Sequence, residues 1–130
     1  MLNVTLLCVG KLKETYWRDA CAEYEKRLKP FCRFSLYEVA EERLPDNPSG
    51  AQIASTIEAE GKRLLDRIPK DCAVIPLCIE GKELDSAALS ARIDKFAVDG
   101  ISHIVFIIGG SWGLSDAVKT VRHCGFLCRR

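Results

Sequence analysis

The chain has 130 residues, 48% of them hydrophobic and 28% charged, with a mean hydropathy of +0.00. This length predicts a single domain, residues 1–130, and the composition excludes a disordered, collagen-like or low-complexity chain. The 19 Lys and Arg against 18 Asp and Glu give a formal net charge of +1, which is no overall signature of nucleic-acid binding. The longest apolar run, residues 104–108, is too short to span a bilayer, and the N-terminus has no basic leader, so we expect a cytoplasmic protein.

The seven cysteines predict reduced thiols, because their number is odd and no CxxC pair occurs. Four of them fall in predicted strands or on a predicted helix stripe, where a thiol behaves as a small core hydrophobe: Cys8, Cys21, Cys72 and Cys78. Three further candidates could ligate zinc but lack a fourth ligand: His123, Cys124 and Cys128. No metal is therefore expected.

The first third of the chain reads as strand, helix, strand. Residues 2–9 alternate in a manner typical of a strand. Apolar side chains at spacings of four, three and four predict a helix over residues 14–29, which Pro30 ends: Trp17, Cys21, Tyr24 and Leu28. A second alternating strand is predicted over residues 31–39.

The remainder continues the alternation. A Pro- and Gly-containing loop precedes a helix over residues 51–68, and residues 73–79 form an apolar strand of the kind covered on both faces. Asp85 can cap a third helix, which Gly100 ends. The most hydrophobic strand, residues 104–108, leads into the sequence GGSWGLS, where Ser115 can cap a last helix through Val121. The order βαβαβαβα predicts an α/β fold, a mostly parallel sheet with helices on both faces.

Ligands of open parallel sheets bind beyond the carboxyl ends of the strands. Two predicted loops there stand out, residues 77–82 and residues 109–115. Gly109 and Gly110 let the backbone approach a ligand without an intervening Cβ, and Gly113 permits a positive φ before the last helix. A tight strand-to-helix turn explains the same glycines equally well. The loop lacks the GK[ST] ending of a phosphate loop and is not a GxGxxG dinucleotide motif.

Other polar and aromatic residues give weaker signals. Trp112 could stack on a ligand or base, or pack over its loop or in a subunit interface. Glu80 could contact a ligand hydroxyl, although a loop glutamate is more often solvated, and His103 is more often a structural histidine at the sheet edge than a ligand. A set of basic residues could form a face on and beside the first helix, with solvation as the simpler interpretation of each: Lys11, Lys13, Arg18, Lys26, Arg27, Lys29 and Arg33.

Three segments resemble the family of ribosomal RNA large-subunit methyltransferase H: VTLLCVGKLKETYWRDACAEYEKRLKPF, VIPLCIEGKELDS and IVFIIGGSWGLSDAV. The resemblance implies an α/β-knot (SPOUT) homodimer that uses S-adenosylmethionine to methylate N3 of a pseudouridine in 23S rRNA within the ribosome. It further implies cofactor contacts from Leu77, after the third strand, and Gly110, in the glycine pair, with Gly109, Gly113 and Leu114 in the same loop. It implies no membrane partner, no metal, and no catalytic base that the matching residues identify.

Residues 119–130 do not match the family pattern, which continues with a strand, a Thr-Leu-Pro-His loop and a long helix that together form the knot. We therefore expect weak or absent S-adenosylmethionine binding, little methyl transfer, and an uncovered apolar face where the partner chain should dock. A shifted reading frame is one hypothesis, tested by translating the coding DNA in the other frames for the missing Pro-His segment. Two rival interpretations stay open: a non-catalytic α/β module that binds ribosomal RNA or a protein partner, and a nucleotide binder of another flavodoxin-like kind.

Overall fold

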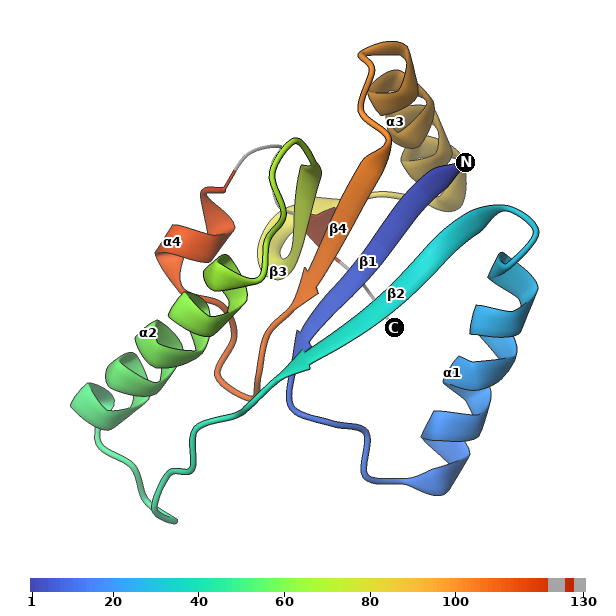
Figure 1. Ribbon diagram of the computed structural model, residues 1–130. Helices are drawn as coiled ribbons and strands as arrows, with labels where there is room; N and C mark the ends of the chain where they lie inside the picture. The colour runs from blue at the N-terminus through green and yellow to red at the C-terminus, as the bar shows by residue number, and fades with distance from the viewer. Residues whose placement is uncertain (122–125, 128–130) are drawn as a thin grey trace.

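Five parallel strands form one sheet in the order β2-β1-β4-β3-β5, with helices packed on its two faces (Figure 1). The computed structural model describes residues 1–121 and 126–127. Its strands are β1 (Leu2–Val9), β2 (Cys32–Val39), β3 (Ala73–Glu83), β4 (His103–Ile108) and β5 (Phe126–Leu127). Its helices are α1 (Thr15–Leu28), α2 (Gly50–Asp66), α3 (Ser86–Val98) and α4 (Asp116–Lys119).

The predicted fold class, a parallel α/β sheet with helices on both faces, is confirmed. The first strand has the predicted bounds, while β3 runs four residues past the predicted end at residue 79 and α4 ends at Lys119 instead of continuing to Val121. The zinc-ligand candidates His123, Cys124 and Cys128 lie outside the described residues, as does most of the atypical segment 119–130.

Local hydrogen bonds explain where two of the helices begin. Ser49 and Gln52 form a capping box: the Ser49 hydroxyl accepts from the Gln52 N–H at 3.2 Å, and Gln52 Oε1 accepts from the Ser49 N–H at 2.7 Å. At the start of α3 the Asp85 carboxylate accepts from the Ala88 N–H at 2.7 Å. The predicted cap at Asp85 is thus confirmed, and each cap satisfies a backbone donor that has no partner within the helix.

Two apolar clusters hold the layers together. One lies between the sheet and helices α2 and α4 and includes Leu7, Ile107, Leu64 and Val118, all at most 1% exposed. The other lies on the opposite face, where Phe96 of α3 packs with strand residues of β3 and β4. Alternate residues of the central strand β4 therefore face opposite clusters, which is why its sequence is almost continuously apolar.

Helix α1 has no buried residue and contacts the sheet only beside β2 (Figure 1). Its predicted apolar stripe is largely exposed, with Trp17 at 55% and Tyr24 at 65%. The expectation that Cys21 is a core residue was wrong, because no other described element covers this side of α1. Among the other cysteines expected in the core, Cys72 is buried, whereas Cys8 and Cys78 are half-buried.

Candidate functional site

The predicted loop over residues 77–82 is instead the second half of strand β3, and it begins where the predicted glycine loop follows β4, at the carboxyl edge of the sheet. Leu77 of β3 pairs in parallel register with Ile108, the last residue of β4, and Gly109 follows directly. Leu77 is half-buried, and the Ile108 side chain is 41% exposed. The residues predicted to bind a cofactor therefore begin on adjacent strands, where parallel sheets open their ligand sites.

The glycine loop, residues 109–113, folds tightly back on itself. The Gly113 N–H donates to the Gly110 carbonyl at 3.1 Å, and Gly113 has φ +90°, which favours glycine. A Cβ on Gly109 would lie 2.9 Å from the Gly113 backbone and from the Leu114 side chain. Since real Cβ atoms do not approach backbone so closely, the loop can form this turn only with glycine at position 109.

Gly110 lies against a buried carboxylate. A Cβ at this position would be 2.9 Å from Glu60 Oε1 and 3.3 Å from Cγ1 of Val9. Glu60, on the inner side of α2, is only 5% exposed. The second glycine of the pair therefore brings the loop backbone close to a negatively charged side chain that is largely shielded from water.

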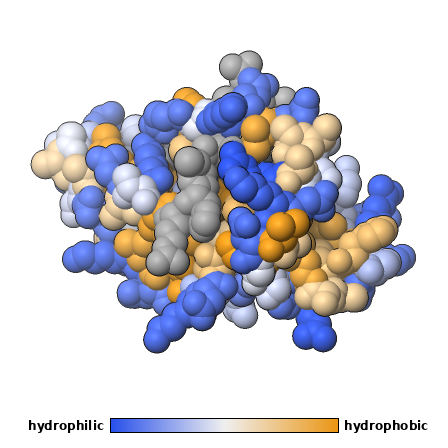
Figure 2. All heavy atoms as spheres, turned by 90° about the horizontal axis from the view of Figure 1, so that it is seen from above, coloured by the Kyte–Doolittle hydropathy of each residue, from blue (hydrophilic) through white to orange (hydrophobic). Residues whose placement is uncertain are grey.

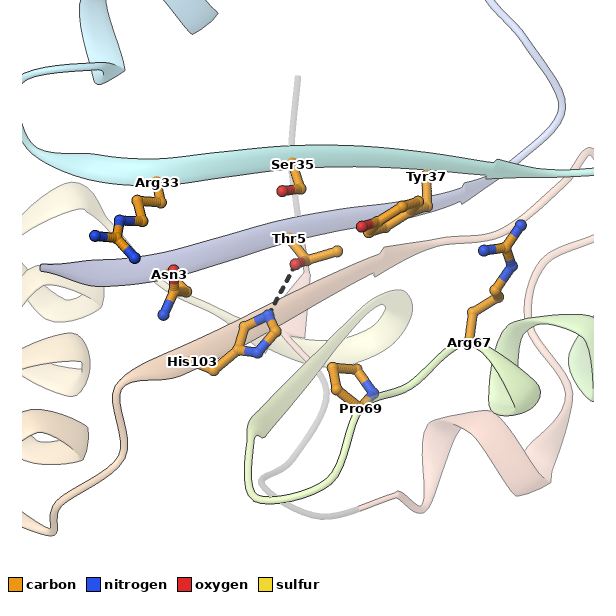
Figure 3. A pocket seen from close by; sticks show the side chains of 8 residues that line it. All are labelled: Asn3, Thr5, Arg33, Ser35, Tyr37, Arg67, Pro69 and His103. Atoms are coloured by element: carbon orange, nitrogen blue, oxygen red, sulfur yellow. Dashed lines mark hydrogen bonds between the residues drawn. The ribbon is translucent and has the colours of Figure 1, made fainter.

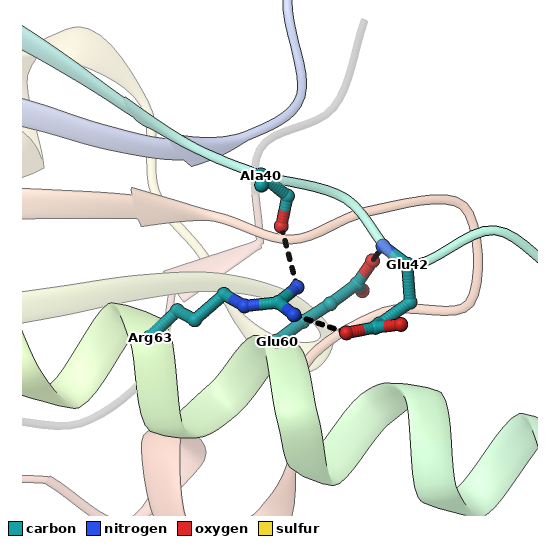
Figure 4. A network of polar contacts seen from close by, with 4 residues as sticks. All are labelled: Ala40, Glu42, Glu60 and Arg63. Carbon is teal, nitrogen blue, oxygen red and sulfur yellow. Dashed lines mark hydrogen bonds and ion pairs between the residues drawn. The ribbon is translucent and has the colours of Figure 1, made fainter.

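Glu60 belongs to a polar network that fastens the segment after β2 to α2 (Figure 4). Its Oε2 accepts from the Glu42 N–H at 3.0 Å. Arg63, one helical turn along, donates to the Ala40 carbonyl at 2.9 Å and forms an ion pair with the Glu42 carboxylate. The network holds the ends of β2 and α2 in a fixed relation beside the glycine loop.

Beyond the glycine loop the chain turns into the core. Leu114 is 6% exposed and packs with the α2 and α4 cluster, so its side chain belongs to the core and is not free to contact a ligand. Ser115 is 4% exposed, and its hydroxyl accepts from the Val118 N–H at 3.3 Å, which confirms the predicted cap of the last helix. Trp112, by contrast, is 49% exposed and available for stacking.

An ion pair links strand β3 to helix α4. Lys119 Nζ of α4 donates to Glu80 Oε1 of β3 at 2.8 Å. This hydrogen bond lowers the pKa of the Glu80 carboxyl and raises the pKa of the Lys119 ammonium. Glu80 is thus neither simply solvated nor unpartnered; it connects the strand that bears Leu77 to the helix that follows the glycine loop.

The remaining sequence candidates lie away from this edge. His103 begins β4 at the opposite end of the sheet, in a central strand, and is hydrogen-bonded to Thr5 with 2.8 Å between Nε2 and Oγ1. Arg18 donates to the carbonyls of Leu12 and Lys13, and Arg27 pairs with a glutamate of its own helix. Two cavities formed by described residues run along β2 and the end of α2, and neither is lined by Leu77 or the glycine loop.

Residues 2–124 match the family described as Predicted SPOUT methyltransferase. The chain belongs to the SPOUT methyltransferase family. It is 47% identical over 117 residues to the ribosomal RNA large subunit methyltransferase H of Pediococcus pentosaceus and 45% identical over 117 residues to that of Bifidobacterium adolescentis. Each alignment covers 90% of this chain and 74% of the relative. The protein is accordingly a methyltransferase by family, and the all-parallel sheet agrees with a SPOUT-type α/β fold.

Sequence reasoning missed Glu60 and Arg63 of this SPOUT chain. A signal for Glu60 was present: it lies three residues after Ile57 and four before Leu64, on the apolar stripe of the helix. A carboxylate on a buried stripe requires a partner, which Glu42 provides through its backbone N–H. That partner comes from a loop 18 residues away, and helix periodicity contains no information about it.

In the part of this SPOUT chain that the structure describes, no helix has the length and apolar character needed to cross a membrane. Within residues 1–121 and 126–127, no group of three or more His, Cys, Asp or Glu side chains is arranged to hold a metal ion.

Proposed function

We propose that this SPOUT chain is an S-adenosylmethionine-dependent methyltransferase that acts on N3 of a pseudouridine in 23S ribosomal RNA. The observation that carries the proposal is the meeting of Leu77 and the glycine loop at one carboxyl edge of a parallel sheet. The relatives named as large-subunit ribosomal RNA methyltransferases support the substrate class. The N3 position and the pseudouridine rest on the resemblance of the three sequence segments.

The groups at this edge fit S-adenosylmethionine chemically. Half-exposed Leu77 and Ile108 offer apolar contact to a flat adenine ring, and the glycine loop offers backbone N–H and C=O groups without intervening Cβ atoms. The buried Glu60 carboxylate beside Gly110 favours a ligand that carries positive charge, as this cofactor does. The proposed cofactor-binding residues are Leu77, Gly109, Gly110, Gly113 and Leu114, the last through its backbone.

A bound cofactor would supply an electrophilic methyl group on a sulfonium, and N3 would release its proton to water as the new N–C bond forms. The residues of the chain therefore have mainly to bind and orient. The tight turn at Gly109 and Gly113 fixes the loop backbone before a ligand arrives, which reduces the entropy lost on binding. Exposed Trp112 can stack on the target base and bring N3 into line with the methyl group. Orientation of this kind contributes a large share of the rate when no covalent intermediate is needed.

The decisive experiment pairs cofactor titration with methyl transfer. We expect calorimetry to give one S-adenosylmethionine site per chain, and labelled methyl groups to appear in 23S rRNA when ribosomes are the substrate. A methyl group on N3 blocks the Watson–Crick edge, so a stop of reverse transcription locates it. Ribosomes that lack the pseudouridine are the matched control and should remain unlabelled. A folded chain that takes up no cofactor would reject the enzyme in favour of a non-catalytic binding module.

We further propose that two copies of the chain pair, and that the reaction occurs in the cytoplasm, where ribosomes are assembled. Pairing is supported by the exposed apolar side chains of α1 and the adjoining segment, where Trp17, Tyr24 and Phe31 are 55%, 65% and 76% exposed. Figure 2 looks onto the molecule from above and shows hydrophobic groups scattered among the hydrophilic ones. Exposed aromatic side chains are enriched at interfaces between protein chains, which favours this side of α1 as the contact.

A further inference from the structure

A cavity of about 350 Å³ opens on one face of the sheet near the amino-terminal ends of its strands (Figure 3). Arg33, Ser35 and Tyr37, on alternate positions of β2, form one wall. Arg67 and Pro69, which follow α2, form the opposite rim. The cavity exists because α2 ends at Asp66 and therefore covers only the carboxyl half of this face of the sheet.

The lining of this cavity is polar where the same face of the sheet is otherwise apolar. Asn3 and Thr5 lie in register with Arg33 and Ser35, and Asn3 also pairs with His103. Farther along the same strands, the inward positions are the buried core residues Leu7, Val105 and Ile107. A sheet face that changes from core hydrophobes to hydrogen-bonding side chains within one strand is suited to a polar ligand, not to a packed helix.

The charge of the lining selects an anion. Arg33 and Arg67 line the cavity together with an imidazole, and no Asp or Glu lines it. Among the described residues, neither arginine forms an ion pair with a carboxylate. The Arg67 guanidinium instead lies over the Tyr37 ring, 5.6 Å from its centroid, which holds it at the rim with donors to spare. The two guanidinium groups lie at opposite ends of the cavity (Figure 3), so each can hold a phosphate group of its own with its free donors.

The uncharged hydrogen-bonding side chains of the cavity are also held in place. Thr5 is 5% exposed and hydrogen-bonded to His103, so the imidazole is held at the floor of the cavity by a buried partner. Asn3 and Ser35 point into the same space (Figure 3). Phosphate contacts in nucleic-acid complexes combine such amide and hydroxyl donors with Arg side chains.

We propose that this cavity binds two phosphate groups of the RNA strand, one at Arg33 and one at Arg67, at a place separate from the methyl-transfer edge. The proposal rests on the proposed function for its source of phosphate. The six residues of β4, His103 to Ile108, span five steps of about 3.3 Å and so separate the two sites by about 17 Å. A second cavity shares Arg67 and continues along β2 to Ala40 and Arg63, beside the Glu60 network. One RNA stem, which carries a phosphate at each nucleotide of both strands, can reach both sites.

The first test uses inorganic phosphate and does not depend on RNA. NMR titration should give saturable shifts of the Arg33 and Arg67 Nε–H signals and of the His103 ring. Arg33→Gln should weaken the phosphate affinity reported by the His103 ring at least tenfold, while the Arg67 shifts persist. Lys95→Gln, which removes the same charge from α3, is the matched control and should leave all these shifts unchanged. The absence of saturable shifts in the wild-type protein would overturn the site.

The second test identifies the source of the phosphate. For a short RNA hairpin, the slope of log affinity against log salt should fall by about 0.7 to 0.9 for Arg33→Gln and for Arg67→Gln, because each variant loses one phosphate contact. Circular dichroism checks that both variants remain folded. Phosphate shifts with an unchanged slope would overturn RNA as the source in favour of free phosphate. Titration with S-adenosylmethionine reports the proposed function separately, because that ligand binds at the other end of the strands.

Discussion

Gly61 of α2 lies directly against the side chain of Ser115, which caps α4. A Cβ built on Gly61 would overlap Ser115 Oγ, and the same Oγ accepts the Val118 N–H at 3.3 Å. The absence of a side chain at position 61 therefore lets the start of α4 dock on α2. This contact orients the segment that immediately follows the glycine loop.

Gly61→Ala should destabilise the protein by about 1–2 kcal/mol, although alanine is the better helix former. The new methyl group has to displace Ser115 and break its cap, and a lost cap costs about 1 kcal/mol. Urea unfolding measures the effect. Gly50→Ala in the same helix is the control, since nothing lies within 4 Å of a Cβ there. Adding Ser115→Gly to Gly61→Ala should restore most of the stability, and no recovery would show that the overlap is not the cause.

Gly110→Ala should weaken S-adenosylmethionine binding at least tenfold. Its Cβ would meet Glu60 Oε1 at 2.9 Å and Val9 at 3.3 Å, so either the loop moves or the Glu60 side chain gives up its hydrogen bond from the Glu42 N–H. Calorimetric titration measures the affinity, with Gly50→Ala as the control. Unchanged affinity in the folded variant would contradict the role of Gly110 at the cofactor edge.

The strands and helices could be predicted from the sequence because their signals are local. The alternation from Leu2 to Val9, the cap at Asp85 and the apolar run of β4 each depend on neighbouring residues alone. The order of strands has no such signal: β1 pairs with β4, about one hundred residues away, because crossover helices and shared core residues decide it. The carboxyl edge was predictable only as a general rule for parallel sheets.

The site itself was predictable in part. The glycines and Leu77 stand out in the sequence, and they do lie at one edge. The polar cavity of Arg33 and Arg67 was not foreseen, since Arg33 was grouped with the basic residues around α1 and instead lines the face of the sheet nearest the end of α2. Whether a strand residue faces one layer or the other depends on register with its neighbours, and a one-residue difference reverses it.

The Glu80–Lys119 pair predicts a pH dependence of known sign. The lowered pKa of Glu80 means that its contribution to stability is present above the ordinary carboxyl pKa and is lost as pH falls through the lowered value. The raised pKa of Lys119 means that its contribution is complete below the ordinary ammonium pKa and is lost as pH rises through the raised value. NMR titration of the Glu80 carboxyl measures its lowered pKa directly. Lys119→Met should raise the Glu80 midpoint, whereas Lys82→Met should not; an unmoved midpoint in the former would refute the pairing.

Replacing Trp17 should weaken the proposed pairing of two chains. The side chain is 55% exposed on α1, which buries nothing in the single chain, so its loss should leave the unfolding free energy of the monomer unchanged. Truncating an aromatic residue at the centre of an interface costs about 2 kcal/mol, or about 30-fold in dissociation constant. Sedimentation equilibrium of Trp17→Ala measures this. Val98→Ala, 85% exposed on α3, is the control, and equal dissociation constants for the two variants would exclude α1 from the interface.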